Sequence, residues 1–78
     1  MMKINLLAFA QTRVQLGFSE LVVECSAGET PRTILLRAAP EFVPDKSLRV
    51  AVNQEYAEWD KPIGEAFEMA LIPPVSGG

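Results

Sequence analysis

Residues 30–40, TPRTILLRAAP, carry the clearest helix signal in this chain and decide its fold. Thr30 can cap the free backbone N–H groups of a helix, and Pro31 suits the first helical position, where a missing N–H costs nothing. Pro40 ends the helix because it disfavours helical geometry at the residue before it. The apolar residues between these signals share one helical face: Ile34, Leu35 and Ala38. The stretch therefore predicts a single short helix with one face to bury.

Apolar and polar residues alternate on both sides of this helix, a pattern that is typical of β-strands. Residues 3–10 (KINLLAFA) and 20–26 (ELVVECS) predict two strands that pair as a hairpin, joined by a connection with a turn at Gly17. The predicted strands after the helix are residues 48–53 (LRVAVN), a short return strand from Tyr56, and residues 67–72 (FEMALI).

The order of these elements predicts an α+β fold, in which one main helix packs across a mixed sheet of four or five strands. A β-grasp (ubiquitin-like) arrangement fits this order, with the last strand parallel to the first. Alternation predicts mostly core positions for Phe9, Phe67, Met69 and Leu71, and we expect Phe42 and Val43 to cover the core. We expect Cys25 in the core, and Tyr56 and Trp59 in the core or at its rim.

The composition of the chain excludes several classes of function. Its 78 residues suit one small domain, and they include one cysteine and no histidine. Histidine-dependent nucleophile pairs, zinc sites with histidine and cysteine clusters are thereby excluded, so we expect no bound metal. The net charge is −3 and the basic residues are scattered along the sequence, so we expect neither nucleic acid nor a membrane as partner. A cytoplasmic binding or carrier module is the class that remains.

The end of the sequence, PPVSGG, predicts a separate tail at residues 73–78 after a domain at residues 1–72. Pro73 and Pro74 have no N–H to donate, so two prolines after a strand stop sheet pairing and favour an extended chain. Gly77 and Gly78 have no Cβ, so their backbone can enter a slot that is too narrow for side chains. The alternative is a terminus without a role.

Three stretches resemble the small, sulfur-carrying subunits of molybdopterin synthase, the MoaD type within the MoaD/ThiS family. They are FAQTR at residues 9–13, AVNQEY at residues 51–56 and EMALIPPVSGG at residues 68–78. The family usually has an Asp-Gly-Asp type of turn before its last strand, and this chain has GEAFEM at residues 64–69 instead.

The resemblance implies that the chain is a carrier and not an enzyme by itself. An E1-like enzyme would use ATP to adenylate the carboxylate of Gly78, and a sulfur-transfer protein would convert it to a thiocarboxylate. The large synthase subunit would take this group and pass its sulfur to cyclic pyranopterin monophosphate, within a heterotetramer. Gly77 would provide a slim approach, and the remaining implied contacts with partners are Pro73, Pro74, Val75, Ser76 and, for the fold or a partner, Arg13.

Other functions remain open at this point. A related carrier could serve thiazole synthesis, cysteine synthesis or tRNA thiolation. A ubiquitin-like modifier would instead join Gly78 to lysines of other proteins, and a plain interaction domain would not use its tail at all.

Overall fold

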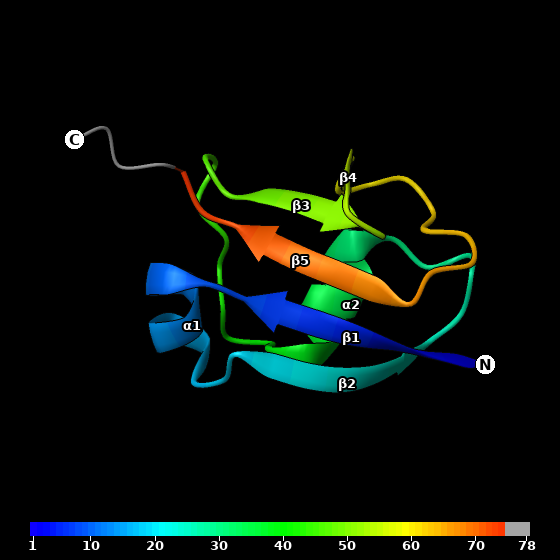
Figure 1. The fold of residues 1–78 in the computed structure, drawn as a ribbon, viewed down its shortest axis with the longest axis horizontal. Helices are drawn as coiled ribbons and strands as arrows, with labels where there is room; N and C mark the ends of the chain where they lie inside the picture. Colours follow the sequence, from blue (N-terminus) through cyan, green and yellow to red (C-terminus); the bar gives the residue numbers. More distant parts are fainter. Residues whose placement is uncertain (75–78) are drawn as a thin grey trace.

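The computed structural model of this protein describes residues 1–74, which form a five-stranded mixed sheet and two helices. The elements are β1 (Met2–Ala8), α1 (Ala10–Leu16), β2 (Glu20–Cys25), α2 (Pro31–Ala38), β3 (Arg49–Val52), β4 (Glu55–Ala57) and β5 (Glu68–Ile72). The strand order is β2-β1-β5-β3-β4, and β5 runs parallel to β1 at the centre of the sheet while the other neighbours are antiparallel (Figure 1). This topology confirms the predicted β-grasp arrangement.

The start of α2 follows the predicted capping. The Thr30 hydroxyl oxygen accepts the N–H of Thr33 at 3.2 Å, and the Thr33 hydroxyl oxygen accepts the N–H of Thr30 at 3.1 Å. Pro31 begins the helix, and the chain leaves it at Ala39, whose N–H donates to the Leu35 carbonyl. Reciprocal bonds of this kind satisfy backbone groups that the helix itself leaves free.

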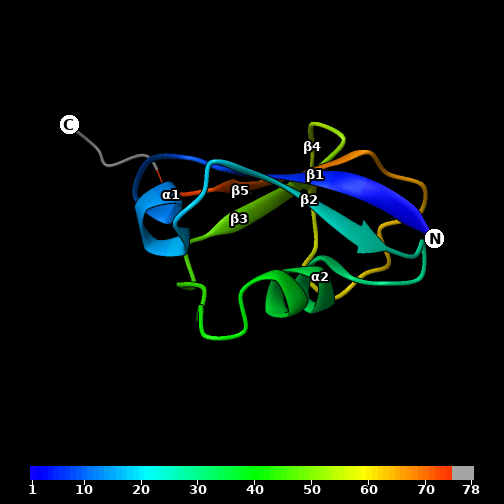
Figure 2. The same cartoon turned by 90° about the horizontal axis from the view of Figure 1, so that it is seen from below.

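One face of the sheet is covered by α2, whereas no helix lies over the other face (Figure 2). The side chains between α2 and the sheet are almost fully buried, and they come from all parts of the chain. They include Ile4, Leu6, Val23, Cys25, Ile34, Leu35, Val50, Met69 and Leu71. The predicted core positions Cys25, Met69 and Leu71 are thereby confirmed.

The predicted connection between the first two strands is wrong, because residues 10–16 form the helix α1. β1 ends at Ala8, two residues earlier than predicted, and the chain turns at Ala10 with φ +51°. Alanine rarely adopts this left-handed conformation, so the sequence has no signal for the turn. Gly17 ends α1 at φ +85°, and its N–H donates to the Arg13 carbonyl at 2.9 Å. The predicted turn at Gly17 is confirmed as a helix C-cap.

Three predicted core positions are also wrong. Phe9 follows β1 and is 49% exposed, and Phe67 precedes β5 and is 63% exposed. Phe9 follows β1 with an extended backbone and continues the side of Leu7, on the face of the sheet that no helix covers. Phe67 lies before β5, where the alternation of buried and exposed residues no longer holds. Val43 is 84% exposed in the loop after α2, whereas its neighbour Phe42 packs against the core as expected.

Two adjacent leucines of α2 test which face of this helix stabilises the fold. Leu35 is 3% exposed and Leu36 is 58% exposed. We expect Leu35→Ala to lower the free energy of unfolding by about 2 to 5 kcal/mol, because it leaves a cavity in the core. The same substitution at Leu36 should change it by less than about 0.5 kcal/mol. Urea denaturation measures both values, and equal losses would contradict the packing of α2.

Candidate functional site

The base of the predicted tail lies at the end of β5. This strand ends at Ile72, after which Pro73 is half-buried and Pro74 is exposed. Sheet pairing thus stops where the two prolines were expected to stop it. The other predicted tail residues are Val75, Ser76, Gly77 and Gly78, and they lie outside the described residues.

A small hollow of about 90 Å³ lies beside the two prolines, which form part of its wall. Its walls come from α1, from the loop before β3 and from the two prolines, and they combine polar and apolar side chains. The lining residues are Gln11, Thr12, Gln15, Phe42, Asp45, Ser47, Leu48, Pro73 and Pro74. The helix that the sequence did not reveal is therefore a neighbour of the tail base, at the end of the sheet where β1 and β5 both finish (Figure 1).

Arg13 lies on α1 but does not line this hollow. Its carbonyl accepts the N–H of Gly17, so its backbone helps to end the helix. Its side chain is exposed, and no ion pair within residues 1–74 includes it. The structure thus gives Arg13 a backbone role in the fold and leaves its guanidinium available to a partner.

The uncovered face of the sheet carries a group of apolar side chains that we call the outer face. The strand registers place Leu7 beside Ala70, Ala70 beside Ala51 and Ala51 beside Tyr56. By alternation, Ile72 and Phe9 point to the same side at the end where the tail begins. The outer face therefore comprises Leu7, Phe9, Ala51, Tyr56, Ala70 and Ile72. Both alanines are nearly buried, whereas the rings of Phe9 and Tyr56 are exposed.

The turn before β5, where this chain departs from the Asp-Gly-Asp pattern, is fixed by Asn53. Its side-chain oxygen accepts the N–H groups of Phe67 at 3.0 Å and Glu68 at 3.3 Å. Its side-chain amide donates to the Glu65 carbonyl at 3.4 Å, and its backbone N–H donates to the Glu68 carbonyl at 3.0 Å. Gly64 supplies the left-handed conformation of the turn, with φ +69°. Asn53 and Gly64 thus fix the turn in the absence of the Asp-Gly-Asp pattern.

The loop that contains this turn is also joined to the start of α2. The N–H of Ile63 donates to the Glu29 carbonyl at 2.8 Å, and the N–H of Gly64 donates to the Ala27 carbonyl at 2.9 Å. Trp59 is half-buried next to them, and its indole N–H donates to the Leu48 carbonyl at 3.2 Å. The prediction of Trp59 as a core or rim residue is confirmed. The same prediction is wrong for Tyr56, whose side chain is 71% exposed on the uncovered face of the sheet.

Cys25 is completely buried on β2. Burial raises the pKa of its thiol, so the nucleophilic thiolate is disfavoured, and the thiol is enclosed by the core. Among residues 1–74 no group of three or more Cys, Asp or Glu side chains could hold a metal ion. No helix in the same range is long and apolar enough to cross a membrane.

Comparisons with known proteins agree with this geometry. The profile of the ThiS family matches residues 6–78. The chain is 30% identical over 80 residues to a protein of Arabidopsis thaliana named molybdopterin synthase sulfur carrier subunit, covering 97% of this chain and 83% of that protein. A protein of the same name from Dictyostelium discoideum is 32% identical over 81 residues, covering 95% and 94%. The structure of SAMP1 from Haloferax volcanii has the same fold, with a TM-score of 0.76, 24% identity and coverage of 99% and 100%.

The contribution of the Asn53 side chain can be measured against its neighbour. Asn53→Gly keeps a residue that accepts φ +52° and removes all the side-chain bonds. We expect the free energy of unfolding to fall by about 1 to 3 kcal/mol, because three backbone groups lose their side-chain partner and one of them, the N–H of Glu68, is partly buried. Gln54→Gly is the control, since Gln54 also has a positive φ, of +69°, and its side chain makes no hydrogen bond within residues 1–74. Gln54→Gly should leave the free energy of unfolding unchanged or raise it slightly. An equal loss in both variants would contradict the role of the Asn53 side chain in fixing this turn.

Proposed function

The chain belongs to the ThiS family, and from this premise we propose that it is the sulfur carrier subunit of a molybdopterin synthase. The observation that carries the proposal is the end of β5 at Ile72, directly before Pro-Pro-Val-Ser-Gly-Gly. Relatives that are named for this role match nearly the whole chain. The absence of histidine and the burial of the one cysteine support a role in which the tail, and no side chain, carries the sulfur.

The proposed chemistry begins at the carboxylate of Gly78. A carboxylate is a poor acyl donor, so an E1-like enzyme first attaches it to the phosphate of AMP, consuming ATP and releasing pyrophosphate. The outer sulfur of a persulfide on a sulfur-transfer protein then displaces AMP and forms an acyl disulfide. A second thiol cleaves the S–S bond of this acyl disulfide, which releases the thiocarboxylate and leaves a disulfide on the donor side. In the large synthase subunit this sulfur bonds to a carbon of cyclic pyranopterin monophosphate, and water cleaves the acyl–sulfur bond, so that the carrier is returned with a carboxylate.

Each tail residue has a mechanical task in this proposal. Gly77 and Gly78 let the backbone approach a reacting centre without side chains, and Val75 and Ser76 guide the tail in the channel of the partner. Pro73 and Pro74 separate the tail from the sheet at the hollow beside α1. The domain offers no histidine, so the large subunit would supply the acid and base groups, including a lysine.

The outer face supports docking of the large subunit. It begins at Ile72, next to the tail base, so a partner that holds the tail would meet this face at the same time. An exposed apolar surface beside polar residues is typical of a protein interface. Phe9 and Tyr56 offer the large exposed rings that often dominate binding energy at such interfaces. Arg13 lies on α1 close to Phe9 and would contribute a rim contact.

Deletion of Gly78 tests the proposed carrier chemistry. We expect the intact protein, incubated with ATP, its activating enzyme and a sulfur donor, to gain the mass of one sulfur in place of one oxygen at Gly78. The deletion variant should gain none, and it should support no sulfuration of the pterin. Gly28→Ala is the matched control, because a Cβ at Gly28 meets open space. Cys25→Ala should still acquire the sulfur. Pterin sulfuration that continues without Gly78 would refute the proposal.

The same preparation separates the alternatives. Recovery of a molybdopterin synthase large subunit with the tagged chain supports the proposal. Recovery of a thiazole synthase instead would move the chain to another sulfur-transfer route. Isopeptide bonds between Gly78 and lysines, without any thiocarboxylate, would identify a protein modifier.

The docking role of the outer face is tested with Phe9→Ala. The exposed ring of Phe9 makes this change compatible with folding, and loss of a large aromatic contact should weaken binding of the large subunit by about tenfold or more. Val14→Ala is the control, since Val14 is an exposed apolar residue of α1 outside the outer face. Titration calorimetry measures both affinities. Equal affinities for the two variants would remove Phe9 from the interface.

A further inference from the structure

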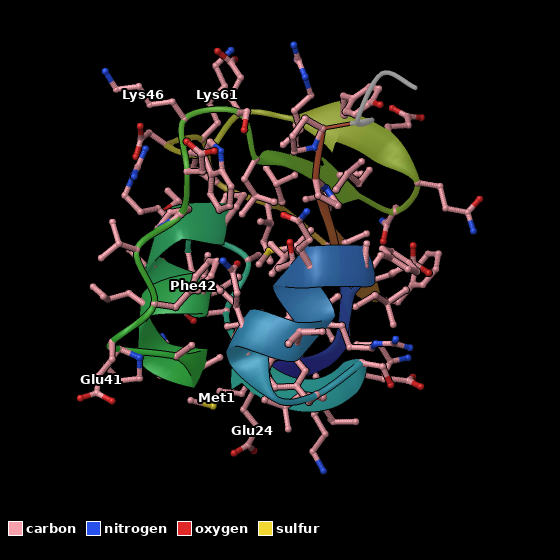
Figure 3. The ribbon with its side chains drawn as sticks, turned by 90° about the vertical axis from the view of Figure 1, so that its left-hand side faces the viewer. Met1, Glu24, Glu41, Phe42, Lys46 and Lys61 are labelled. Atoms are coloured by element: carbon pink, nitrogen blue, oxygen red, sulfur yellow. The ribbon has the colours of Figure 1, made fainter. Side chains whose placement is uncertain are left out.

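A second surface, which we call the basic groove, runs along the edge of the sheet at β4. It has a volume of about 680 Å³ and lies between the start of β3, the strand β4 and the loop after it. Four of the seven Lys and Arg residues of the chain line it: Arg32, Lys46, Arg49 and Lys61. Lys46 and Lys61 lie at the same end of the molecule, whereas Glu24 and Glu41 lie at the opposite end (Figure 3). More than half of the basic residues of the chain thus line one groove.

Two of the four cations already have acidic partners inside the groove. Asp60 accepts two hydrogen bonds from the Arg32 guanidinium, at 2.6 and 3.2 Å, and this contact lowers the pKa of Asp60 and raises that of Arg32. Glu58 pairs with Lys61 at 2.7 Å and raises its pKa. These are the only acidic residues among those that line the groove.

Arg49 and Lys46 have no ion pair within residues 1–74. The Arg49 guanidinium lies over the ring of Tyr56 at 6.0 Å from its centroid, just as Arg32 lies over Trp59 at 5.9 Å. A guanidinium stacked in this way keeps its orientation while its N–H groups remain free to bind a carboxylate at two points. Arg32 has its carboxylate from Asp60. Arg49 presents the same arrangement without one.

We propose that the basic groove is a binding site for an acidic peptide segment of a partner protein, whose carboxylates bind Arg49 and Lys46. Arg49 begins β3 and Lys46 lies three residues earlier, in the loop before this strand. Two cations at this spacing can bind two neighbouring carboxylates of an extended peptide. A nucleic acid is disfavoured, because the chain has a net charge of −3 and Glu58 and Asp60 stand in the groove. Binding of such a polyanion depends on neutralising many phosphates.

The basic groove adjoins the hollow at the tail base, because Ser47 and Leu48 line both. Arg49 is the register partner of Ile72, the last residue of β5. A partner bound in the groove would thus lie next to the start of the tail. The proposal does not depend on the sulfur-carrier chemistry, since it concerns charged side chains that take no part in that chemistry.

A titration of the full chain with N-acetylated tetraglutamate amide tests the proposal. We expect saturable changes in the backbone amide signals around Arg49 and along β4, and weaker binding at higher salt. Arg49→Gln should weaken binding by about tenfold, because it removes a charge-assisted pair of hydrogen bonds. Arg49→Lys keeps the charge without the planar fork and should give an intermediate affinity. Lys3→Gln is the control, since it removes one exposed positive charge outside the groove.

Four results would overturn the proposal. Lys3→Gln could weaken binding as much as Arg49→Gln, which would indicate attraction by general charge alone. Tetraglutamine amide could bind equally well, or inorganic phosphate could saturate the same amides as tightly, which would indicate a site without selectivity for acidic peptides. Tighter binding of an oligothymidine would identify a nucleic-acid surface. Unchanged signals elsewhere in the Arg49→Gln spectrum establish that this variant is folded.

Discussion

The parallel pairing of β1 with β5 is the constraint on which the rest of this structure depends. It joins the first and the last strand of the domain at the centre of the sheet, with Leu6 opposite Met69 and Ala8 opposite Leu71. Because a tight turn cannot join parallel neighbours, the chain between these two strands must cross from one side of the pair to the other. α2 lies in that crossover, between β2 on one side of the pair and β3 on the other, and it covers one face of the sheet. The small core therefore draws on both ends of the chain.

The same pairing determines where the functional surfaces lie. β1 and β5 finish at the same end of the sheet. The helix α1, which follows β1, and Pro73, which follows β5, are therefore neighbours. The face opposite α2 stays uncovered, and its apolar residues reach Ile72 at this end. A tail that begins here is adjacent to an apolar face on one strand and to Arg49 on the next. The parallel pairing thus brings the outer face and Arg49 close to the base of the tail.

Much of the fold could be predicted from the sequence because local signals and tertiary packing agree. Thr30, Pro31 and Pro40 mark α2, and alternation marks the inner residues of β1, β3 and β5. The helix α1 could not be predicted, since Phe9 makes no side-chain cap and Ala10 adopts a conformation that alanine rarely shows. The exposed positions of Phe9 and Phe67 could not be predicted either, because they depend on which face of the sheet α2 covers and on where β5 begins.

One part of the candidate site could likewise be predicted from local sequence, whereas another part depends on tertiary contacts. The tail base at Pro73 and Pro74 could be read from residue types, because proline excludes sheet pairing by its own chemistry. The hydrogen bonds of Asn53 to the turn before β5, and the stacking of Arg49 on Tyr56, join segments that are separate in the sequence and could not be predicted from it. Asn53 shows why a missing turn motif need not mean a missing turn. Its side chain binds backbone groups, which every residue except proline offers, so the residues at 65–67 can change while the entry into β5 is kept.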